Sequence, residues 1–175
     1  LSLNAIYSIK SKFKNSKLIL LTEKPYQKLL EQSKLFDNII VIKRSLFYFY
    51  DVFQIKKKMN FLSLDKVFDL QTSKRSSFYL RIFYKKGICT SGIGKYAKIR
   101  HDNPERDKMH TLDRQAEQLK LSKVSFKKSI DLNWLYPKKQ NKRKIALIVP
   151  GGSKKRLYKR IPIEVFSMII KFLIA

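Results

Sequence analysis

The sequence predicts an α/β protein built around a parallel sheet. Short apolar runs of strand length alternate with segments whose apolar residues recur at helical spacing. Such alternation is typical of chains in which each helix returns the polypeptide to the next parallel strand. The chain has 175 residues, of which 44% are hydrophobic, and this is enough apolar material for a packed core.

The first predicted elements lie before residue 43. Apolar residues recur at helical spacing from Ala5 to Phe13, which predicts an opening helix. Proline is favoured in the first turn of a helix, so Pro25 predicts a second helix that runs to Gln32. The two runs predicted as strands are KLILLT at 17–22 and NIIVI at 38–42.

The central segments continue the alternation. The aromatic run after residue 46 fits a helix or a strand, and its polar tail favours a helix at 47–59. A polar stretch at 71–76 leads into the next predicted helix, and a charged stretch at 95–107 predicts a mobile loop. The remaining predictions are strands at 66–70 and 87–90 and helices at 77–84 and 110–119.

The C-terminal part changes character. Residues 121–143 are rich in lysine and irregular, which favours an interdomain linker. A strand at 144–149 and a helix at 162–174 follow. We therefore predict one domain over 1–140, linker included, and the beginning of a second domain over 141–175.

The composition is strongly basic. There are 39 Lys and Arg against 13 Asp and Glu, a formal net charge of +26. The excess favours anionic partners such as nucleic acid, acidic lipid or phosphorylated substrates, although the abundance of lysine also fits a composition bias of a whole proteome. The single Cys89 excludes an intrachain disulfide and fits a cytoplasmic setting. No apolar run approaches the ~20 residues that span a bilayer, so peripheral contact with the inner membrane is the membrane role we expect.

Two segments carry polar side chains at predicted strand ends, where ligands of α/β proteins gather. In the first, cations could clamp a phosphate or an acidic sugar while neighbouring polar groups bond to hydroxyls; a capped helix with solvated cations is the alternative. In the second, glycines would let the backbone approach a phosphate beside a hydroxyl and a lysine; a plain turn on a basic surface is the alternative. The candidates are Gln71, Ser73, Lys74 and Arg75 in the first segment and Gly151, Gly152, Ser153 and Lys159 in the second.

Other candidate motifs favour structural roles. Asp69 is expected to be a strand-end carboxylate rather than a catalytic base, and a capping or interhelical role is expected for His110 rather than an acid/base pair with Asp113. The segment from Gly92 to Gly94 lacks the third glycine of the dinucleotide fingerprint. His101 has no cysteine beside it, so we expect no metal site.

The order of several segments resembles glycosyltransferase family 9, the ADP-heptose:lipopolysaccharide heptosyltransferases. The resemblance spans nearly the whole chain, and it depends on order and spacing rather than on any single motif. The segments that carry it are LSLNAIYSIKSKF, KLILLT, NIIVIKR, VFDLQTSKRS, HTLDR and IALIVPGGSKKRLYKRIPIEVF.

The resemblance implies a GT-B enzyme, in which two Rossmann-like domains face a cleft. The first domain would hold the lipopolysaccharide core acceptor and the second the nucleotide sugar ADP-heptose. The implied reaction is an inverting transfer of heptose that needs neither a metal nor a cofactor. The family's general base is an aspartate just before the opening helix, so it would lie upstream of Leu1, and we expect these 175 residues to be a fragment that is inactive alone.

The resemblance also assigns residues. Lys159 stands where the family's lysine contacts the donor diphosphate, although Ile161 replaces a usual tryptophan. Gly151, Gly152 and Ser153 match the small and hydroxyl residues beside the phosphates, and Lys74 and Arg75 match basic positions on the acceptor side.

The sequence is also compatible with two functions other than heptosyl transfer. The charge would also suit a basic nucleic-acid-binding module, although no recognisable module of that kind is present. A related glycosyltransferase that uses another nucleotide sugar is the second alternative.

Overall fold

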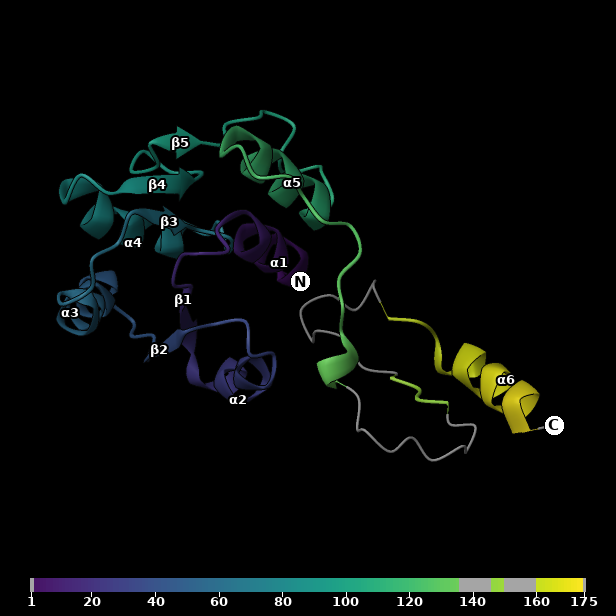
Figure 1. Cartoon of the computed structure of the whole chain (residues 1–175). Helices are drawn as coiled ribbons and strands as arrows, with labels where there is room; N and C mark the ends of the chain where they lie inside the picture. The colour runs from purple at the N-terminus through teal and green to yellow at the C-terminus, as the bar shows by residue number, and fades with distance from the viewer. Residues whose placement is uncertain (1, 136–145, 150–159, 175) are drawn as a thin grey trace. The chain divides into compact units, whose positions relative to one another are not determined.

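The computed structural model describes residues 2–135, 146–149 and 160–174 (Figure 1). The chain divides into two compact units, Leu1–Tyr136 and Pro137–Ala175. Strands and helices alternate through the first unit, which confirms the predicted α/β class. Its helices are α1 (Leu3–Lys12), α2 (Lys24–Gln32), α3 (Tyr48–Met59), α4 (Lys74–Lys85), α5 (Thr111–Leu121) and the 3-10 turn η1 (Asn133–Leu135).

All strand pairs in the described residues are parallel, as predicted, but they form two small sheets. One sheet contains β1 (Ile19–Glu23) and β2 (Asn38–Ile42), with Ile19 opposite Asn38. The other has the order β3–β4–β5, and β4 is paired on both of its edges. This arrangement is compatible with a Rossmann-like α/β fold. The bounds of the second sheet are β3 (Lys66–Phe68), β4 (Cys89–Gly92) and β5 (Ile99–Arg100).

Helices cover the strands on two faces. Val67 and Phe68 are neighbours in β3 but pack into different hydrophobic clusters, and because side chains alternate along a strand the two clusters lie on opposite faces. The first cluster joins β2 to α3 and α4, and the second joins α1 to α5. The buried members are Ile40, Ile42, Ile55, Met59, Tyr79, Leu80, Ile82, Phe83 and Ala97 in the first, and Ala5, Ile9, Leu119 and Val124 in the second.

Three predicted boundaries in the first unit were wrong. Helix α4 begins at Lys74 instead of Ser77, because Ser73 and Ser76 form a capping box that starts the helix earlier. The predicted loop at 95–107 contains β5, which pairs with β4. The predicted linker begins with residues that pack on α1, since Val124 is buried and the Lys127 N–H donates to Ser8 Oγ at 2.8 Å.

In the second unit the described residues form the helix α6 (Ile163–Ile174), which confirms that prediction. Residues 146–149 are not in a strand, contrary to the prediction for 144–149. Leu147 and Val149 are exposed, and no described strand pairs with them. Throughout the described part of the chain, no helix has the length and apolar character needed to traverse a bilayer.

Candidate functional site

Polar side chains gather where β3, β4 and β5 end, at the carboxyl edge of the second sheet. Asp69 follows β3 directly and is buried. Its Oδ1 accepts the N–H groups of Gln71 at 3.1 Å and Thr72 at 2.9 Å, and Ser77 Oγ lies 3.4 Å from Oδ2. Burial raises the pKa of the Asp69 carboxyl, and these hydrogen bonds offset part of the rise. Asp69 therefore organises the turn after β3, as expected for a structural carboxylate.

That turn places the predicted acceptor residues at the start of α4. Ser73 is the N-cap, and its Oγ accepts the Ser76 N–H at 3.1 Å. Gln71 and Lys74 are exposed beside it. The hydroxyl of Ser73 is engaged in capping, whereas the Gln71 amide and the Lys74 ammonium remain accessible to a ligand.

Arg75 points toward α3 and the loop before it. Its Nη1 donates to Asp51 Oδ2 at 2.8 Å and to the Ser45 carbonyl at 2.7 Å, and its guanidinium lies 4.4 Å from the centroid of the Tyr48 ring. These are the contacts of a residue that ties α4 to α3. The assignment of Arg75 to the acceptor stays a prediction.

Two arginines that sequence reasoning did not select lie at this edge. The Arg106 side chain is 12% exposed, and its Nη2 donates to Thr72 Oγ1. Arg114, in the first turn of α5, donates from Nη2 to Thr111 Oγ1 at 3.0 Å. The Nε atoms of both arginines are buried without a hydrogen-bond partner among the described residues. Burial lowers the pKa of Arg106 and the nearby charge of Arg114 lowers it further, while the carboxylates of Asp107, 3.5 Å from Arg106 Nη1, and of Asp69 offset part of this shift.

Thr72 is held in an uncommon backbone conformation between these groups. Its φ of 49° lies in the left-handed region, which β-branched residues rarely adopt and which costs about 1–3 kcal/mol. The Asp69 carboxylate holds its N–H and Arg106 binds its hydroxyl. Thr72 is therefore fixed from both sides, by a carboxylate at its N–H and by a guanidinium at its hydroxyl.

A second contact network fixes the loop that carries Arg106. His101 is buried and its Nε2 lies 2.9 Å from Glu117 Oε2, which also accepts from Asn103 Nδ2 at 2.8 Å. The hydrogen bond from Asn103, followed by that from His101, lowers the pKa of Glu117. The segment predicted to be a mobile loop is thus tied to α5 through His101 and Asn103, just before Pro104.

Two glycines let β4 and the turn after it approach α4 closely. A Cβ at Gly92 would lie 2.8 Å from Leu80 Cδ1, and one at Gly94 would lie 2.9 Å from Ser77 Cβ. Both distances are shorter than real Cβ contacts allow. Close packing against α4 therefore explains why glycine occupies both positions. This agrees with the expectation that the segment is not a dinucleotide-binding loop.

Of the other residues considered from the sequence, the role predicted for His110 is confirmed, and the predicted donor-phosphate residues lie outside the described part of the chain. His110 caps α5, since its Nδ1 accepts the Leu112 N–H at 3.3 Å, and the predicted capping role is confirmed. Among the described residues, no cluster of three or more His, Cys, Asp or Glu side chains could hold a metal ion. The predicted donor-phosphate residues Gly151, Gly152, Ser153 and Lys159 lie outside the described residues.

The chain was compared with protein-family models, curated proteins and solved structures, and none of the three comparisons gives a match.

The sequence contained one usable signal for the two arginines that were missed. Lysine is the usual cation of this chain, so an arginine marks a position where a planar, bidentate donor is of use. Arg106 fell in a segment predicted to be mobile, and Arg114 lay within HTLDR without a role. Spacing alone could not place them together, because β5 and the turn after it bring Arg106 toward Thr72.

Proposed function

We propose that the first unit is the acceptor-binding domain of a glycosyltransferase that moves heptose from ADP-heptose to a lipopolysaccharide core acceptor. The observation that carries this proposal is Arg106, which binds Thr72 at the carboxyl edge of the sheet and lies close enough to Arg114 for the charge of Arg114 to lower its pKa. Asp107 Oδ1 lies 3.5 Å from Arg106 Nη1 but is largely exposed, and the Nε atoms of both arginines are buried without a hydrogen-bond partner among the described residues. An anionic ligand would therefore supply a further counter-charge at this place. An acidic or phosphorylated sugar supplies both the charge and the hydroxyl groups that such an edge can bind.

The exposed groups next to the arginines fit the same acceptor. Gln71 can exchange hydrogen bonds with sugar hydroxyls, and Lys74 adds a mobile positive charge at the start of α4. The resemblance to glycosyltransferase family 9 supports the donor and the reaction, and it assigns the donor diphosphate to Lys159. The reaction would then pair an anionic acceptor on the first unit with a nucleotide sugar bound around 151–159.

The acceptor half of the proposal is tested by calorimetry with a lipid-free, phosphorylated core oligosaccharide. We expect saturable binding to the full chain and at least a tenfold loss in Arg106→Gln and in Arg114→Gln, which corresponds to about 1.4 kcal/mol or more. Arg81→Gln is the matched control, because it removes the same charge from an exposed position on α4. Equal affinity in all three variants would contradict the proposed site.

The donor half and the main rival are tested separately. Saturable binding of ADP-heptose that Lys159→Ala abolishes would support a transferase. Binding of short duplex DNA with a steep salt dependence, weakened equally by Arg81→Gln and Arg106→Gln, would instead favour the nucleic-acid-binding alternative.

A further inference from the structure

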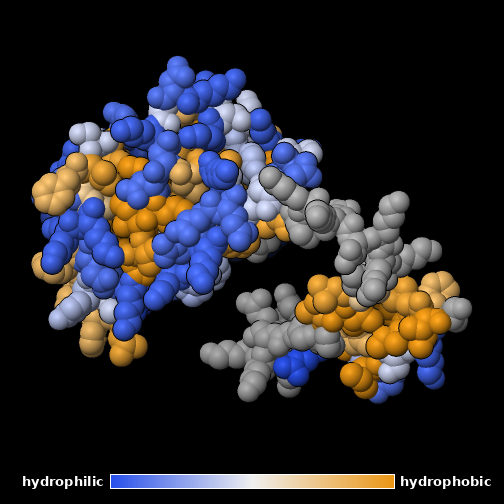
Figure 2. Space-filling view, turned by 60° about the horizontal axis from the view of Figure 1, so that its bottom comes forward, coloured by the Kyte–Doolittle hydropathy of each residue, from blue (hydrophilic) through white to orange (hydrophobic). Residues whose placement is uncertain are grey.

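The first unit exposes a cluster of large apolar side chains around the start of α3. Leu46, Phe47, Phe49, Tyr50 and Phe53, here called the aromatic cluster, are each between 59% and 89% exposed. Figure 2 shows apolar side chains that project from the rim of this unit among hydrophilic ones. Such a concentration of exposed aromatics is unusual for a surface that meets only water.

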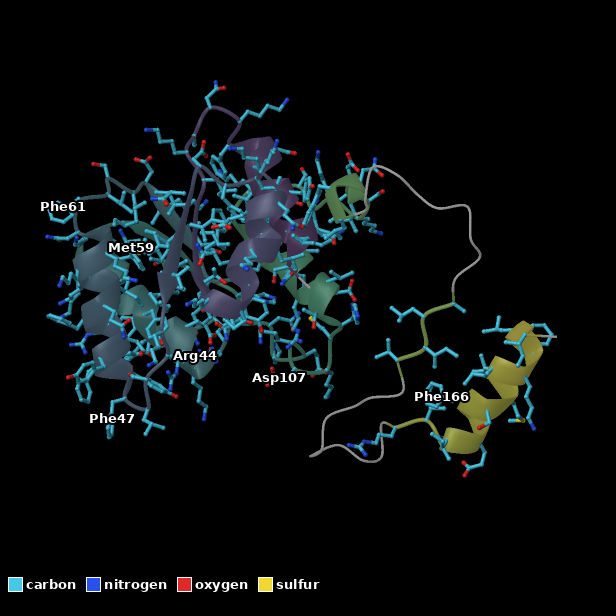
Figure 3. The ribbon with its side chains drawn as sticks, turned by 90° about the horizontal axis from the view of Figure 1, so that it is seen from below. Arg44, Phe47, Met59, Phe61, Asp107 and Phe166 are labelled. Carbon is cyan, nitrogen blue, oxygen red and sulfur yellow. The ribbon has the colours of Figure 1, made fainter. Side chains whose placement is uncertain are left out.

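Three of the rings in the aromatic cluster contact one another, and all five side chains are exposed rather than packed in the core. The centroids of Phe47 and Phe49 are 5.6 Å apart, and those of Phe49 and Tyr50 are 5.7 Å apart. The opposite side of α3 is anchored, because Asp51, Ile55 and Met59 are buried one helical turn apart. Figure 3 shows α3 at the edge of the unit, with Phe47 at one end of the helix. The helix therefore holds the cluster outward on a fixed base.

Cations flank the aromatic cluster on both sides in the sequence. Lys43 is exposed before it, and Lys56 and Lys57 are exposed one turn after Phe53. The face of α3 is aromatic in its first turns and cationic in its last turns. The rings are stabilised by an apolar phase, and the ammonium groups are stabilised by negative charge. The headgroup boundary of an anionic bilayer provides both.

We propose that the aromatic cluster and its flanking lysines dock the chain onto an anionic phospholipid surface. The net charge of the chain favours a membrane at this surface over a second copy of the chain. Each chain carries a net charge of +26, so two copies would bring the flanking lysines together and repel. An anionic membrane attracts the same lysines, and its interface accommodates tyrosine rings and the phenylalanine side chains of amphipathic helices.

Vesicle sedimentation with the full chain tests the proposal. The probes are vesicles of phosphatidylcholine with phosphatidylglycerol and vesicles of phosphatidylcholine alone. We expect binding to the anionic vesicles that falls at least tenfold in the double variant Phe49→Ser, Phe53→Ser. Since both rings are exposed, the variant should keep the wild-type circular dichroism spectrum.

Two double variants serve as controls for other exposed apolar residues. Tyr26→Ser, Leu29→Ser alters α2, and Met168→Ser, Phe172→Ser alters α6; both should bind anionic vesicles as the wild type does. Unchanged binding in the α3 variant, or a tenfold loss in the α6 variant alone, would overturn the proposal. The proposal would also be overturned if the wild-type chain sedimented as a dimer without vesicles and the α3 variant did not. Arg106 and Arg114 lie outside α3, so the α3 variant should bind the lipid-free oligosaccharide normally.

Discussion

Asp51 is the residue on which the contact between α3 and α4 depends most. Its carboxylate is completely buried and accepts from the Ser45 N–H at 2.8 Å, Ser45 Oγ at 2.7 Å, Arg75 Nη1 at 2.8 Å and the Tyr79 hydroxyl. Burial acts to raise the pKa of Asp51, but the hydrogen bonds from Tyr79 and Ser45 and the charge of Arg75 outweigh it and the pKa is lowered. A buried charge on α3 is therefore stabilised by partners from α4 and from the loop before α3.

We expect Asp51→Asn to lower the free energy of unfolding at pH 7 by about 2–3 kcal/mol. The variant removes the carboxylate charge and leaves Arg75 and Tyr79 with a poorer acceptor in an enclosed place. Urea denaturation followed by circular dichroism measures the change. The matched control is Asp113→Asn on the exposed side of α5, for which the loss should be less than about 0.5 kcal/mol.

The loss of stability in Asp51→Asn should depend on pH. Because the folded-state pKa of Asp51 is lowered, its contribution is present above the unfolded pKa of about 4 and is lost as the pH falls through the folded value. The difference between wild type and Asp51→Asn should shrink below pH 4. Asp69 has a raised pKa, so ionisation does not add to its contribution and the difference for Asp69→Asn should not shrink in acid. A pH-independent difference for Asp51 would contradict the ionised pair.

At the scale of elements, apolar spacing predicted the helices and most strands well. Strand β2 and helix α2 lie where the pattern placed them, since a five-residue apolar run and Pro25 are local signals. The errors arise where contacts that apolar spacing does not reveal decide the structure. Strand β5 forms because it pairs with the nearby β4, and α4 starts early because Ser73 and Ser76 form a capping box. Val124 is buried because α5 and the distant α1 enclose it. The position of Arg106 beside Thr72 likewise depends on β5 and the turn after it.

The split of the strands into two sheets predicts unequal protection of their amides. Strand β4 has hydrogen-bonded neighbours on both edges, whereas β1 and β3 each pair on one edge only among the described strands. In hydrogen–deuterium exchange followed by mass spectrometry, we expect peptides from β4 to exchange more slowly than those from β1 and β3. Equal protection in β1 and β4 would show that both edges of β1 are paired in solution.

The whole chain carries an unusual excess of positive charge, and few carboxylates are available to offset it. The formal net charge is +26, while Asp51 and Asp69 are already committed to buried hydrogen bonds. Repulsion among the remaining cations opposes the compact state, and dissolved salt screens it. The same charge serves both proposals, because it attracts an acidic acceptor and an anionic membrane. Comparing two different anions separates the stabilisation that comes from general screening from the stabilisation that comes from specific anion binding.

Raising sodium chloride from 10 to 200 mM should raise the melting temperature of the whole chain, because screening relieves the repulsion. At equal ionic strength, phosphate should raise it further by binding at the proposed site around Arg106 and Arg114, since a ligand that binds only the folded state stabilises it. Differential scanning fluorimetry measures both effects. In Arg106→Gln the rise with chloride should persist and the extra rise with phosphate should vanish, whereas Arg81→Gln should keep both. If phosphate and chloride act alike on the wild type, the arginine pair does not bind phosphate.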